Sequence, residues 1–442
     1  MAKAKGPTAE VEITSLGVRG DGIADSEHGR LYVPYAVPGD RAIVRIGAAK
    51  ADGFQAAIIK MLDAGPGRVD PPCRHFRTCG GCTLQHVKDT LYRDWKRGLV
   101  SGALTRRGLD PDCVAPLLTV QPGSRRRVRL SARATKGGVR LGFFEPASHR
   151  VVDIEECRVV TPEITDLLVP LRGLLGELLP TGAASHVALT LTDSGLDVVL
   201  GLAAAPDAAV LERLVIFAGE HDLARLSWSL VAGSRRQGGD LNPPTPACTR
   251  RAVAMDFSGI KVELPPNGFT QPTADGAALL VAKVKDAVAG AGRVADLYAG
   301  CGAFAFALAG DSTDAAGGVR VKAAEGDTLL VTALNDAARL GGLGEFVTAE
   351  VRDLSRRPLM ADELKGLDAV VLDPPRGGAG PQAKQLAEAS VPLIAYVSCN
   401  PASFAQDARV LVDGGYKLEI VTPLDQFHFT PHVELVAVFR RR

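Results

Sequence analysis

Residues Leu393 to Pro401 spell Leu-Ile-Ala-Tyr-Val-Ser-Cys-Asn-Pro, and this stretch decides the fold. An apolar run ends abruptly in a cysteine followed by Asn-Pro, which predicts a buried strand with Cys399 in the loop at its carboxyl end. Open α/β sheets bind their ligands outside the carboxyl ends of their strands. We therefore expect Cys399 to lie at the functional edge of such a sheet.

Three other strand-like segments of the C-terminal third are Val294 to Tyr298, Val319 to Glu325 and Ala369 to Asp373. The segments between them have room for helices, and alternating strands and helices predict a parallel, doubly wound sheet. A glycine-rich loop at Gly300 to Gly302 would let backbone N–H groups approach a ligand closely. Together with Cys399, this loop suggests a nucleotide-like cofactor beside a nucleophilic thiol.

Length and composition limit what else the chain can be. Its 442 residues predict two to four domains, and 46% hydrophobic with 23% charged residues are ordinary globular values. The net charge of +1 gives no global attraction to nucleic acid, so such binding would need local basic patches. No secretory signal and no long apolar run is present, so we expect a cytoplasmic protein with no membrane partner.

Three of the eight cysteines cluster as Cys73, Cys79 and Cys82, with two glycines between the last pair. A reducing compartment argues against disulfides, so metal binding is the better use of clustered thiols. A fourth thiolate is needed, and Cys157 is a better candidate than Cys113. Sulfur ligation alone allows an iron–sulfur cluster or a tetrahedral zinc ion, and the asymmetric spacing favours a [4Fe–4S] cluster with zinc as the alternative.

The first 64 residues alternate short apolar runs with glycine and charge, which predicts a five-stranded barrel of the OB type. Such a barrel could bind nucleic acid or act as an interdomain brace. Residues 65–262 predict a mainly antiparallel α+β domain that contains the cysteines, a basic helix at about 90–107 and an arginine-rich strand from Arg125 to Arg129. Residues 263–442 form the expected α/β domain. Both basic segments could neutralise phosphates, although such runs are often only solvated surface.

Acidic residues close two strands of the expected α/β sheet. A carboxylate at Glu325 could accept hydrogen bonds from ribose hydroxyls, and Asp373 ends a later strand. Acid-ended strands in this order resemble class I methyltransferases that bind S-adenosylmethionine. A nicotinamide-dependent enzyme is the competing interpretation, although the glycine loop lacks the G-x-G-x-x-G spacing.

The motifs in chain order resemble one family, the S-adenosylmethionine-dependent RNA uracil-5-methyltransferases with an N-terminal TRAM domain and a [4Fe–4S] cluster. The likeness covers almost the whole chain and is nearest to the enzymes that modify 23S ribosomal RNA. It rests on the barrel, the cysteine spacing, the Arg-Arg-Arg-x-Arg strand, Asp-Leu-Tyr-x-Gly-x-Gly, Asp-Pro-Pro-Arg and Ser-Cys-Asn-Pro.

The resemblance implies roles for individual residues. Carbon 5 of uracil is a poor nucleophile, and a thiolate added at carbon 6 turns it into an enolate-like carbon able to take a methyl group. Cys399 would be that thiolate, and Glu434 would accept the carbon 5 proton. The family's cofactor positions fall on Gln271, Tyr298, Glu325 and Asp373.

The resemblance also implies partners. The target uridine must leave its stack, so single-stranded or looped RNA is expected, with 23S ribosomal RNA as the leading substrate and transfer RNA as the alternative. We expect a monomer. An alternative of another class is a non-catalytic RNA-binding or iron–sulfur assembly factor, and a third is a zinc-stabilised methyltransferase of small molecules. Ala299, Ala303 and the segment Phe427 to His432 depart from the usual family pattern.

Overall fold

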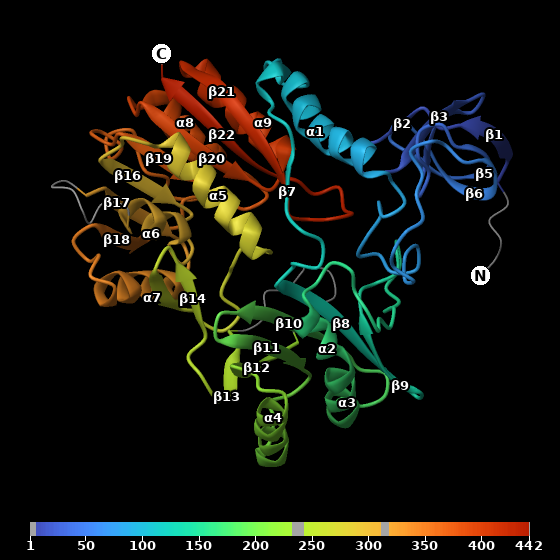
Figure 1. Ribbon diagram of the computed structural model, residues 1–442, viewed down its shortest axis with the longest axis horizontal. Helices are drawn as coiled ribbons and strands as arrows, with labels where there is room; N and C mark the ends of the chain where they lie inside the picture. The colour runs from blue at the N-terminus through green and yellow to red at the C-terminus, as the bar shows by residue number, and fades with distance from the viewer. Residues whose placement is uncertain (1–5, 232–242, 311–317, 442) are drawn as a thin grey trace.

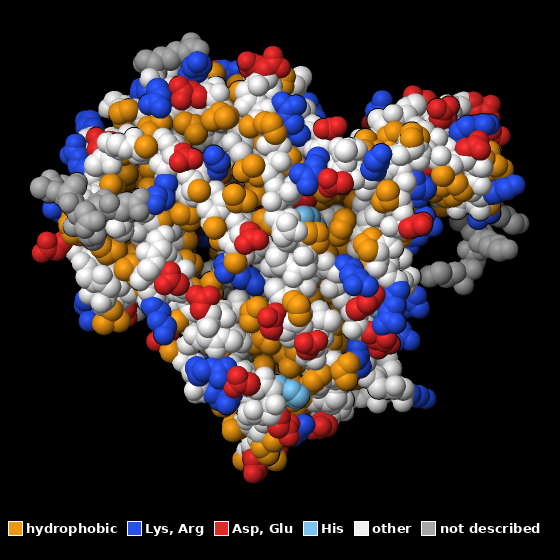
Figure 2. Space-filling model, in the orientation of Figure 1, with side chains coloured by type: hydrophobic (Ala, Val, Ile, Leu, Met, Phe, Trp, Pro, Cys, Tyr) orange, Lys and Arg blue, Asp and Glu red, His pale blue; other side chains and the backbone are white. Residues whose placement is uncertain are grey.

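A computed structural model describes residues 6–231, 243–310 and 318–441. Figure 1 shows a curved N-terminal sheet, a central sheet with helices beside it, and a larger C-terminal sheet that helices cover on both faces. No helix in the described ranges is long and apolar enough to cross a membrane. On the face drawn in Figure 2, acidic and basic side chains are interspersed, in keeping with a net charge near zero.

The N-terminal sheet has six strands in the order β1-β5-β6-β4-β3-β2. These strands are β1 (Thr8–Glu12), β2 (Ser15–Leu16), β3 (Gly22–Ser26), β4 (Gly29–Val33), β5 (Arg41–Lys50) and β6 (Gly53–Asp63). Alternate residues such as Val11, Leu31 and Val44 point into one small core because successive strand side chains face opposite sides. The five expected strands are present, and the two-residue β2 is additional.

The central sheet has the order β13-β12-β11-β10-β8-β9, and its strands are antiparallel except for the parallel pair β11 and β12. Its strands are β8 (Arg127–Thr135), β9 (Gly138–Gly142), β10 (Ala184–Thr192), β11 (Gly195–Leu202), β12 (Arg225–Leu230) and β13 (Thr245–Thr249). The accompanying helices are α2 (Pro162–Asp166), α3 (Leu168–Leu178) and α4 (Ala208–Glu220). This arrangement agrees with the expected antiparallel α+β region.

The C-terminal sheet has the order β18-β17-β16-β19-β20-β22-β21-β7. Its strands are β7 (Leu118–Thr119), β16 (Arg293–Leu297), β17 (Arg320–Glu325), β18 (Val347–Val351), β19 (Ala369–Leu372), β20 (Leu393–Ser398), β21 (Tyr416–Asp425) and β22 (Glu434–Arg441). Strands β16 to β20 are parallel, while β22 runs antiparallel to both β20 and β21. The expected doubly wound parallel sheet therefore ends in an antiparallel edge.

Each face of this sheet carries its own hydrophobic core. One core contains residues of α5 (Ala274–Ala287), α6 (Ala303–Gly310) and α7 (Thr328–Leu340). The other contains residues of α8 (Gly380–Glu388), α9 (Pro401–Asp413) and α1 (Asp89–Thr105). Helices on both faces bury the central strands β19 and β20 completely, which explains why these two strands are apolar throughout, whereas β18 at the edge is partly exposed.

Two segments from the expected second domain pack against the C-terminal sheet. Helix α1 contacts α9, and the 3-10 turn η1 (Pro111–Cys113) leads into β7, which pairs with β21. The hairpin of β14 (Ala254–Phe257) and β15 (Ile260–Glu263) contacts α6 and α7. The domain boundaries at 64/65 and 262/263 stay a prediction from the sequence. The packing joins α1, η1, β7 and the β14–β15 hairpin to the C-terminal core.

Candidate active site and cysteine cavity

Cys399 occupies the turn between β20 and α9, as the opening stretch of sequence predicts. Asn400 caps α9, because its Oδ1 accepts a hydrogen bond from the Ala402 N–H at 3.1 Å. The Asn400 Nδ2 donates to the Arg376 carbonyl at 2.9 Å, which ties this turn to the loop after β19. Cys399 is half-buried, so its thiol is fixed by a capped helix and yet accessible.

Glu434 begins β22, the strand beside β20. The register pairs Leu435 with Ser398, so Glu434 and Cys399 lie at the same edge of the sheet. Glu434 is 3% exposed, and burial raises the pKa of its carboxyl to about 8, with the nearby Asp373 charge adding to the shift. A carboxyl with this pKa exchanges a proton near neutral pH, as a general base should.

Two glutamines connect Glu434 to Asp373. The Gln426 Nε2 donates to Glu434 Oε2 at 3.0 Å and to Gln271 Oε1 at 2.9 Å, and the Gln271 Nε2 donates to Asp373 Oδ2 at 3.3 Å. Gln271 is a predicted site residue, but sequence analysis missed Gln426. Its signal was weak, because a glutamine at the end of an apolar strand is usually a surface residue.

The Cys399 thiol sits among opposing charges. Burial raises its pKa to about 11, Glu434 and Asp373 add to the rise, and Arg376 opposes it. The pKa of Asp373 is itself raised to about 7 by burial and by Glu325. Burial thus keeps Cys399 a thiol at neutral pH, and protonation of either carboxyl removes part of the repulsion that opposes the thiolate.

The glycine-rich loop lies where the predicted cofactor residues meet. Glu325 Oε2 accepts a hydrogen bond from the Gly300 N–H at 3.0 Å, and its Oε1 accepts from the Asp327 N–H at 3.0 Å. Tyr298 has φ 64° and Gly300 has φ 56°, so the chain turns sharply after β16. The loop therefore holds backbone donors around the Glu325 carboxylate.

Asp296 is the last residue but one of β16 and has the most unusual setting. It is 0% exposed, and neither carboxylate oxygen has a hydrogen bond of good geometry among the described residues. Burial raises its pKa to about 7 and the charge of Asp373 adds to the rise, while the nearby Ala305 N–H opposes it. Buried polar atoms without partners are rare, so this edge of the sheet is suited to a polar ligand.

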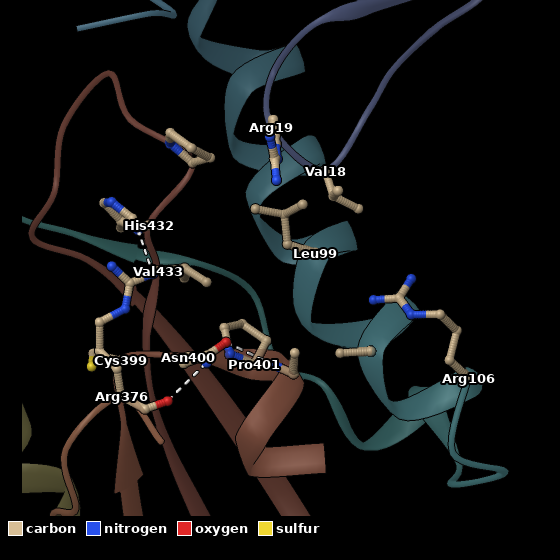
Figure 3. Close-up of a pocket in the computed structure, with 13 residues that line it drawn as sticks. Val18, Arg19, Leu99, Arg106, Arg376, Cys399, Asn400, Pro401, His432 and Val433 are labelled. Atoms are coloured by element: carbon tan, nitrogen blue, oxygen red, sulfur yellow. Dashed lines mark hydrogen bonds between the residues drawn. The ribbon is translucent and has the colours of Figure 1, made fainter. Parts of the chain in front are cut away.

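Cys399 also lines a groove of about 380 Å³. Figure 3 shows Arg376, Cys399 and His432 on loops that adjoin the C-terminal sheet, Leu99 on α1, Arg106 just after the end of α1, and Arg19 in the turn between β2 and β3. The Arg376 guanidinium donates to His432 Nδ1 at 3.4 Å above the thiol. Residues from the N-terminal sheet region, from α1 and from the C-terminal sheet region thus line one groove beside the candidate nucleophile.

The four predicted cysteine ligands lie in one cavity of about 410 Å³. Cys73, Cys79, Cys82 and Cys157 all line it, and none forms a disulfide. Burial raises the pKa of Cys82 to about 12, and the other three thiols add to the rise because they face it. Cys113 lies elsewhere, where its Sγ donates to the Asp110 carbonyl at 3.1 Å.

The side chains that line the cavity include the donor type of a sulfur-ligated group. Four thiols are the donor set that an iron–sulfur cluster takes, and Arg125 and Arg129 in the wall would offset thiolate charge. Within the described ranges, no group of three or more His, Cys, Asp or Glu side chains is arranged to hold a metal ion, so the ligand set stays a prediction from the sequence.

The arginine strand differs from a simple solvated run. Arg126 donates to the Gln271 carbonyl at 3.2 Å, and Arg127 lies 5.0 Å from the centre of the Phe269 ring. Burial lowers the pKa of Arg125, Arg126 and Arg127. These three side chains therefore brace the C-terminal domain, whereas Arg129 is exposed.

The basic helix also needs a correction. Lys96 is 0% exposed and ion-paired with Asp425, so it cannot face RNA phosphates. Its neighbours Arg93, Arg97 and Arg106 are exposed, as expected.

A doubly wound sheet with a thiol, a buried carboxyl and a glycine-rich loop outside the carboxyl ends of its strands is the architecture of an α/β protein that binds its ligands at this edge. Residues 252–442 match a family model described as tRNA (uracil-5-)-methyltransferase. A relative from Rhizobium meliloti (strain 1021), named as an RNA methyltransferase, is 40% identical over 98% of this chain and 100% of its own length.

Two further relatives have assigned targets. The 23S rRNA (uracil(1939)-C(5))-methyltransferase RlmD of Chromohalobacter salexigens is 34% identical over 98% of this chain and 89% of its own length. The crystal structure of the Pyrococcus abyssi tRNA (uracil-54, C5)-methyltransferase, solved with S-adenosyl-L-homocysteine, matches with a TM-score of 0.75 and 25% identity over 97% of this chain and 99% of that one.

This chain belongs to the RNA uracil-5-methyltransferase family. It is therefore an RNA-modifying enzyme, and the nicotinamide-dependent and non-catalytic interpretations are set aside.

Proposed function

We propose that this enzyme transfers a methyl group from S-adenosylmethionine to carbon 5 of one uridine in 23S ribosomal RNA. The observation that carries the proposal is the meeting of Cys399 and the buried Glu434 at one sheet edge, beside a groove open to a base. The full-length likeness to an enzyme with a ribosomal target supports the RNA class. Transfer RNA is the second candidate, because the structural neighbour acts on it.

The reaction begins with Cys399. Its thiolate adds to carbon 6 of the uracil, and the electron pair of the 5,6 double bond moves toward the carbonyl at carbon 4. Arg376, exposed beside the thiol, lowers the pKa of Cys399 and would stabilise developing negative charge on the base. Carbon 5 then carries the electron density that attacks a methyl group.

Glu434 completes the reaction. After methylation, carbon 5 holds both a proton and the new methyl group, and the Glu434 carboxylate takes the proton. The released electron pair re-forms the double bond, the carbon–sulfur bond breaks, and Cys399 leaves as a thiolate. Gln426 orients the carboxylate through its 3.0 Å hydrogen bond.

S-adenosylmethionine supplies the methyl group when it is bound. Gln271, Tyr298, Glu325 and Asp373 would hold it, with Glu325 suited to ribose hydroxyls because its oxygens are acceptors at the end of β17. The unpartnered Asp296 carboxylate is a further acceptor at this edge.

We propose that Cys73, Cys79, Cys82 and Cys157 hold a [4Fe–4S] cluster with a structural role, with zinc as the alternative. The four free thiols that line one cavity support this assignment. A broad absorbance band near 400 nm in anaerobically purified protein would identify the cluster, and a Cys73→Ser variant should lose it. Full metal content in that variant would overturn the ligand assignment.

The groove beside Cys399 is the proposed path of the RNA. The apolar floor of the groove contains Leu99. Around it lie Arg19 from the turn between β2 and β3, Arg106 at the C-cap of α1, and Arg376, an arrangement that suits phosphates around an unstacked nucleotide. A flipped uracil would enter at Cys399, and the neighbouring nucleotides would lie toward the N-terminal sheet.

The decisive test is mass spectrometry of separated ribosomal and transfer RNA from cells that lack the gene. We expect one 5-methyluridine to be lost from ribosomal RNA and restored by the wild-type gene but not by Cys399→Ala. Loss from transfer RNA would support the second candidate. If every 5-methyluridine persists and the purified protein labels neither RNA, the proposal fails.

A further inference from the structure

A loop between two strands carries the groups that surround the proposed proton acceptor. It begins after Asp425, at the end of β21, and ends at Glu434, the start of β22. Gln426 lies at its first position and His432 near its last, so its two ends flank the site. Whatever fixes this loop also fixes the groups around Glu434.

Lys96 of α1 holds both ends of this loop. Its ammonium donates to Asp425 Oδ1 at 2.5 Å, to the Phe427 carbonyl at 3.3 Å and to the His432 carbonyl at 2.5 Å. An ammonium has three N–H donors, and all three have acceptors here. Lys96 and Asp425 are both 0% exposed, so no water competes for these bonds.

Tyr92, one helical turn earlier on α1, strengthens the same attachment. Its hydroxyl donates to Asp425 Oδ2 at 2.7 Å and accepts from the Phe429 N–H at 2.9 Å. Phe429 has φ 61°, a strained value for a bulky residue, so the middle of the loop is held in a conformation that it would not adopt alone. Helix α1 therefore forms hydrogen bonds with the start, the middle and the end of the loop.

We propose that Lys96 is a positioning residue for the removal of the carbon 5 proton. It acts through the loop: Asp425 fixes the backbone that places Gln426, and Gln426 orients the Glu434 carboxylate. The inference rests on the proposed function, because it assigns Lys96 to one step of that reaction. It also separates Lys96 from the exposed cations of α1, which face the groove or solvent.

If the side chain at position 96 only filled space, an apolar residue would be expected there. Burying two charges is costly, and an apolar side chain of similar length would fill the same space at a lower desolvation cost. What an apolar side chain cannot do is bind two carbonyls and a carboxylate that lie on opposite ends of a loop. The contacts of Lys96 are thus those required for loop closure.

The test separates addition of Cys399 from its release. In Lys96→Met, radiolabelled methyl groups should accumulate in a covalent protein–RNA adduct, because methyl transfer proceeds while Glu434 is poorly oriented. We expect release to slow by roughly tenfold. Loss of the general base itself would slow it more, by about 100- to 10,000-fold. The probe is a transcript of 23S ribosomal RNA or of transfer RNA, whichever the wild-type protein labels.

A second substrate isolates the steps that precede proton removal. The same transcript made with 5-fluorouridine has no carbon 5 proton, so its adduct cannot be released once the base is methylated, and formation of that adduct does not need Glu434. Lys96→Met should trap this RNA as fast as the wild type. An equal slowing with both RNAs would mean general damage to the site and would overturn the inference.

Two further variants keep the test decisive. Lys384→Met, an exposed lysine of α8, is the matched control and should behave as the wild type. Tyr92→Phe removes only one hydroxyl and should show the same adduct to a smaller extent, so it decides the question if Lys96→Met does not fold. Normal release in both Lys96→Met and Tyr92→Phe would overturn the inference about Lys96 and leave the proposed function intact. If the wild type labels neither RNA, the proposed function itself fails.

Discussion

Cys399 carries a conflict between its surroundings and its proposed task. The reaction needs a thiolate, yet burial and two carboxyls raise the pKa of the thiol to about 11. Glu434 has a pKa of about 8, so it can be protonated while the thiolate forms and ionised when a proton must be accepted. The two groups need not be charged together, and the proposed order of steps does not require it.

Replacing Glu434 with glutamine tests this coupling in the protein without RNA. Above pH 8, the wild-type carboxylate is ionised and disfavours the thiolate, whereas Glu434→Gln keeps the shape and removes the charge. The pKa of Cys399 should therefore fall in the variant. The measurement is the rate of iodoacetamide alkylation of Cys399 as a function of pH, with each thiol resolved by mass spectrometry.

Cys113 supplies an internal control for this experiment. Its thiol is half-buried and bonded to the Asp110 carbonyl, outside the groove and the cysteine cavity, so its alkylation profile should not change. An unchanged or higher pKa of Cys399 in Glu434→Gln would mean that the two side chains do not interact as described.

Individual residues also show what the sequence could and could not predict. Cys399 was predictable, because an apolar run that ends in a lone thiol is rare and chemically specific. Lys96 and Gln426 were not, because their roles depend on partners more than 300 residues away or on a strand pairing that no local pattern records. A lysine on a helix with four nearby arginines is normally solvated, and burial of Lys96 is decided by tertiary packing alone.

At the scale of elements, the cysteine segment and the active-site loop are directly joined. The Thr83 and Leu84 N–H groups both donate to the Phe429 carbonyl, at 2.8 and 3.1 Å. Residues His428, Thr430, Pro431 and His432 also line the cysteine cavity. A group held by the four cysteines would thus rest against the same loop that α1 holds from the other side.

Hydrogen exchange can test this connection. If the proposed cluster is removed by oxidation, the segment around Cys82 should loosen, and the amides of residues 427–432 should lose at least about tenfold protection, or about 1.4 kcal/mol of local opening free energy. Peptides from β10 and β11 in the central sheet should not change, because they lie outside the cavity. Equal protection with and without the cluster would show that the cluster does not stabilise the loop.

The elements themselves were largely predictable, since their signals are local. The apolar strands β16, β19 and β20 lie where the pattern indicated, whereas the arginine strand β8 begins at Arg127, so Arg125 and Arg126 precede it. The antiparallel edge of the C-terminal sheet was not predictable, because β21 and β22 look like ordinary apolar strands. Their direction is fixed by a hairpin whose loop contributes residues to the candidate site. The attachment of β7 and α1 to that edge was missed for the same reason.

Over the whole molecule, the site concentrates acidic groups that a stable fold would avoid. Burial raises the pKa of Asp296 to about 7, since its carboxyl has no hydrogen bond of good geometry among the described residues and the nearby Ala305 N–H offsets only part of the rise. An unfolded chain loses that proton near pH 4, so between pH 4 and 7 the folded state binds more protons than the unfolded state. Its contribution to the free energy of unfolding therefore falls as pH rises through this range.

Asp296→Asn should remove this penalty. Relative to the wild type, we expect the variant to gain stability steadily from pH 5 to pH 7. Above pH 7 its advantage should stay constant, because Asp296 is then ionised in both the folded and the unfolded wild type. Thermal unfolding without cofactor at pH 5, 6, 7 and 8 gives the difference. The control is Asp353→Asn, since the pKa of this exposed carboxyl is lowered by Ser355 and its effect should be constant across the same range. A flat difference for Asp296→Asn would mean that the buried carboxyl is already ionised at pH 5, with a donor that compensates it.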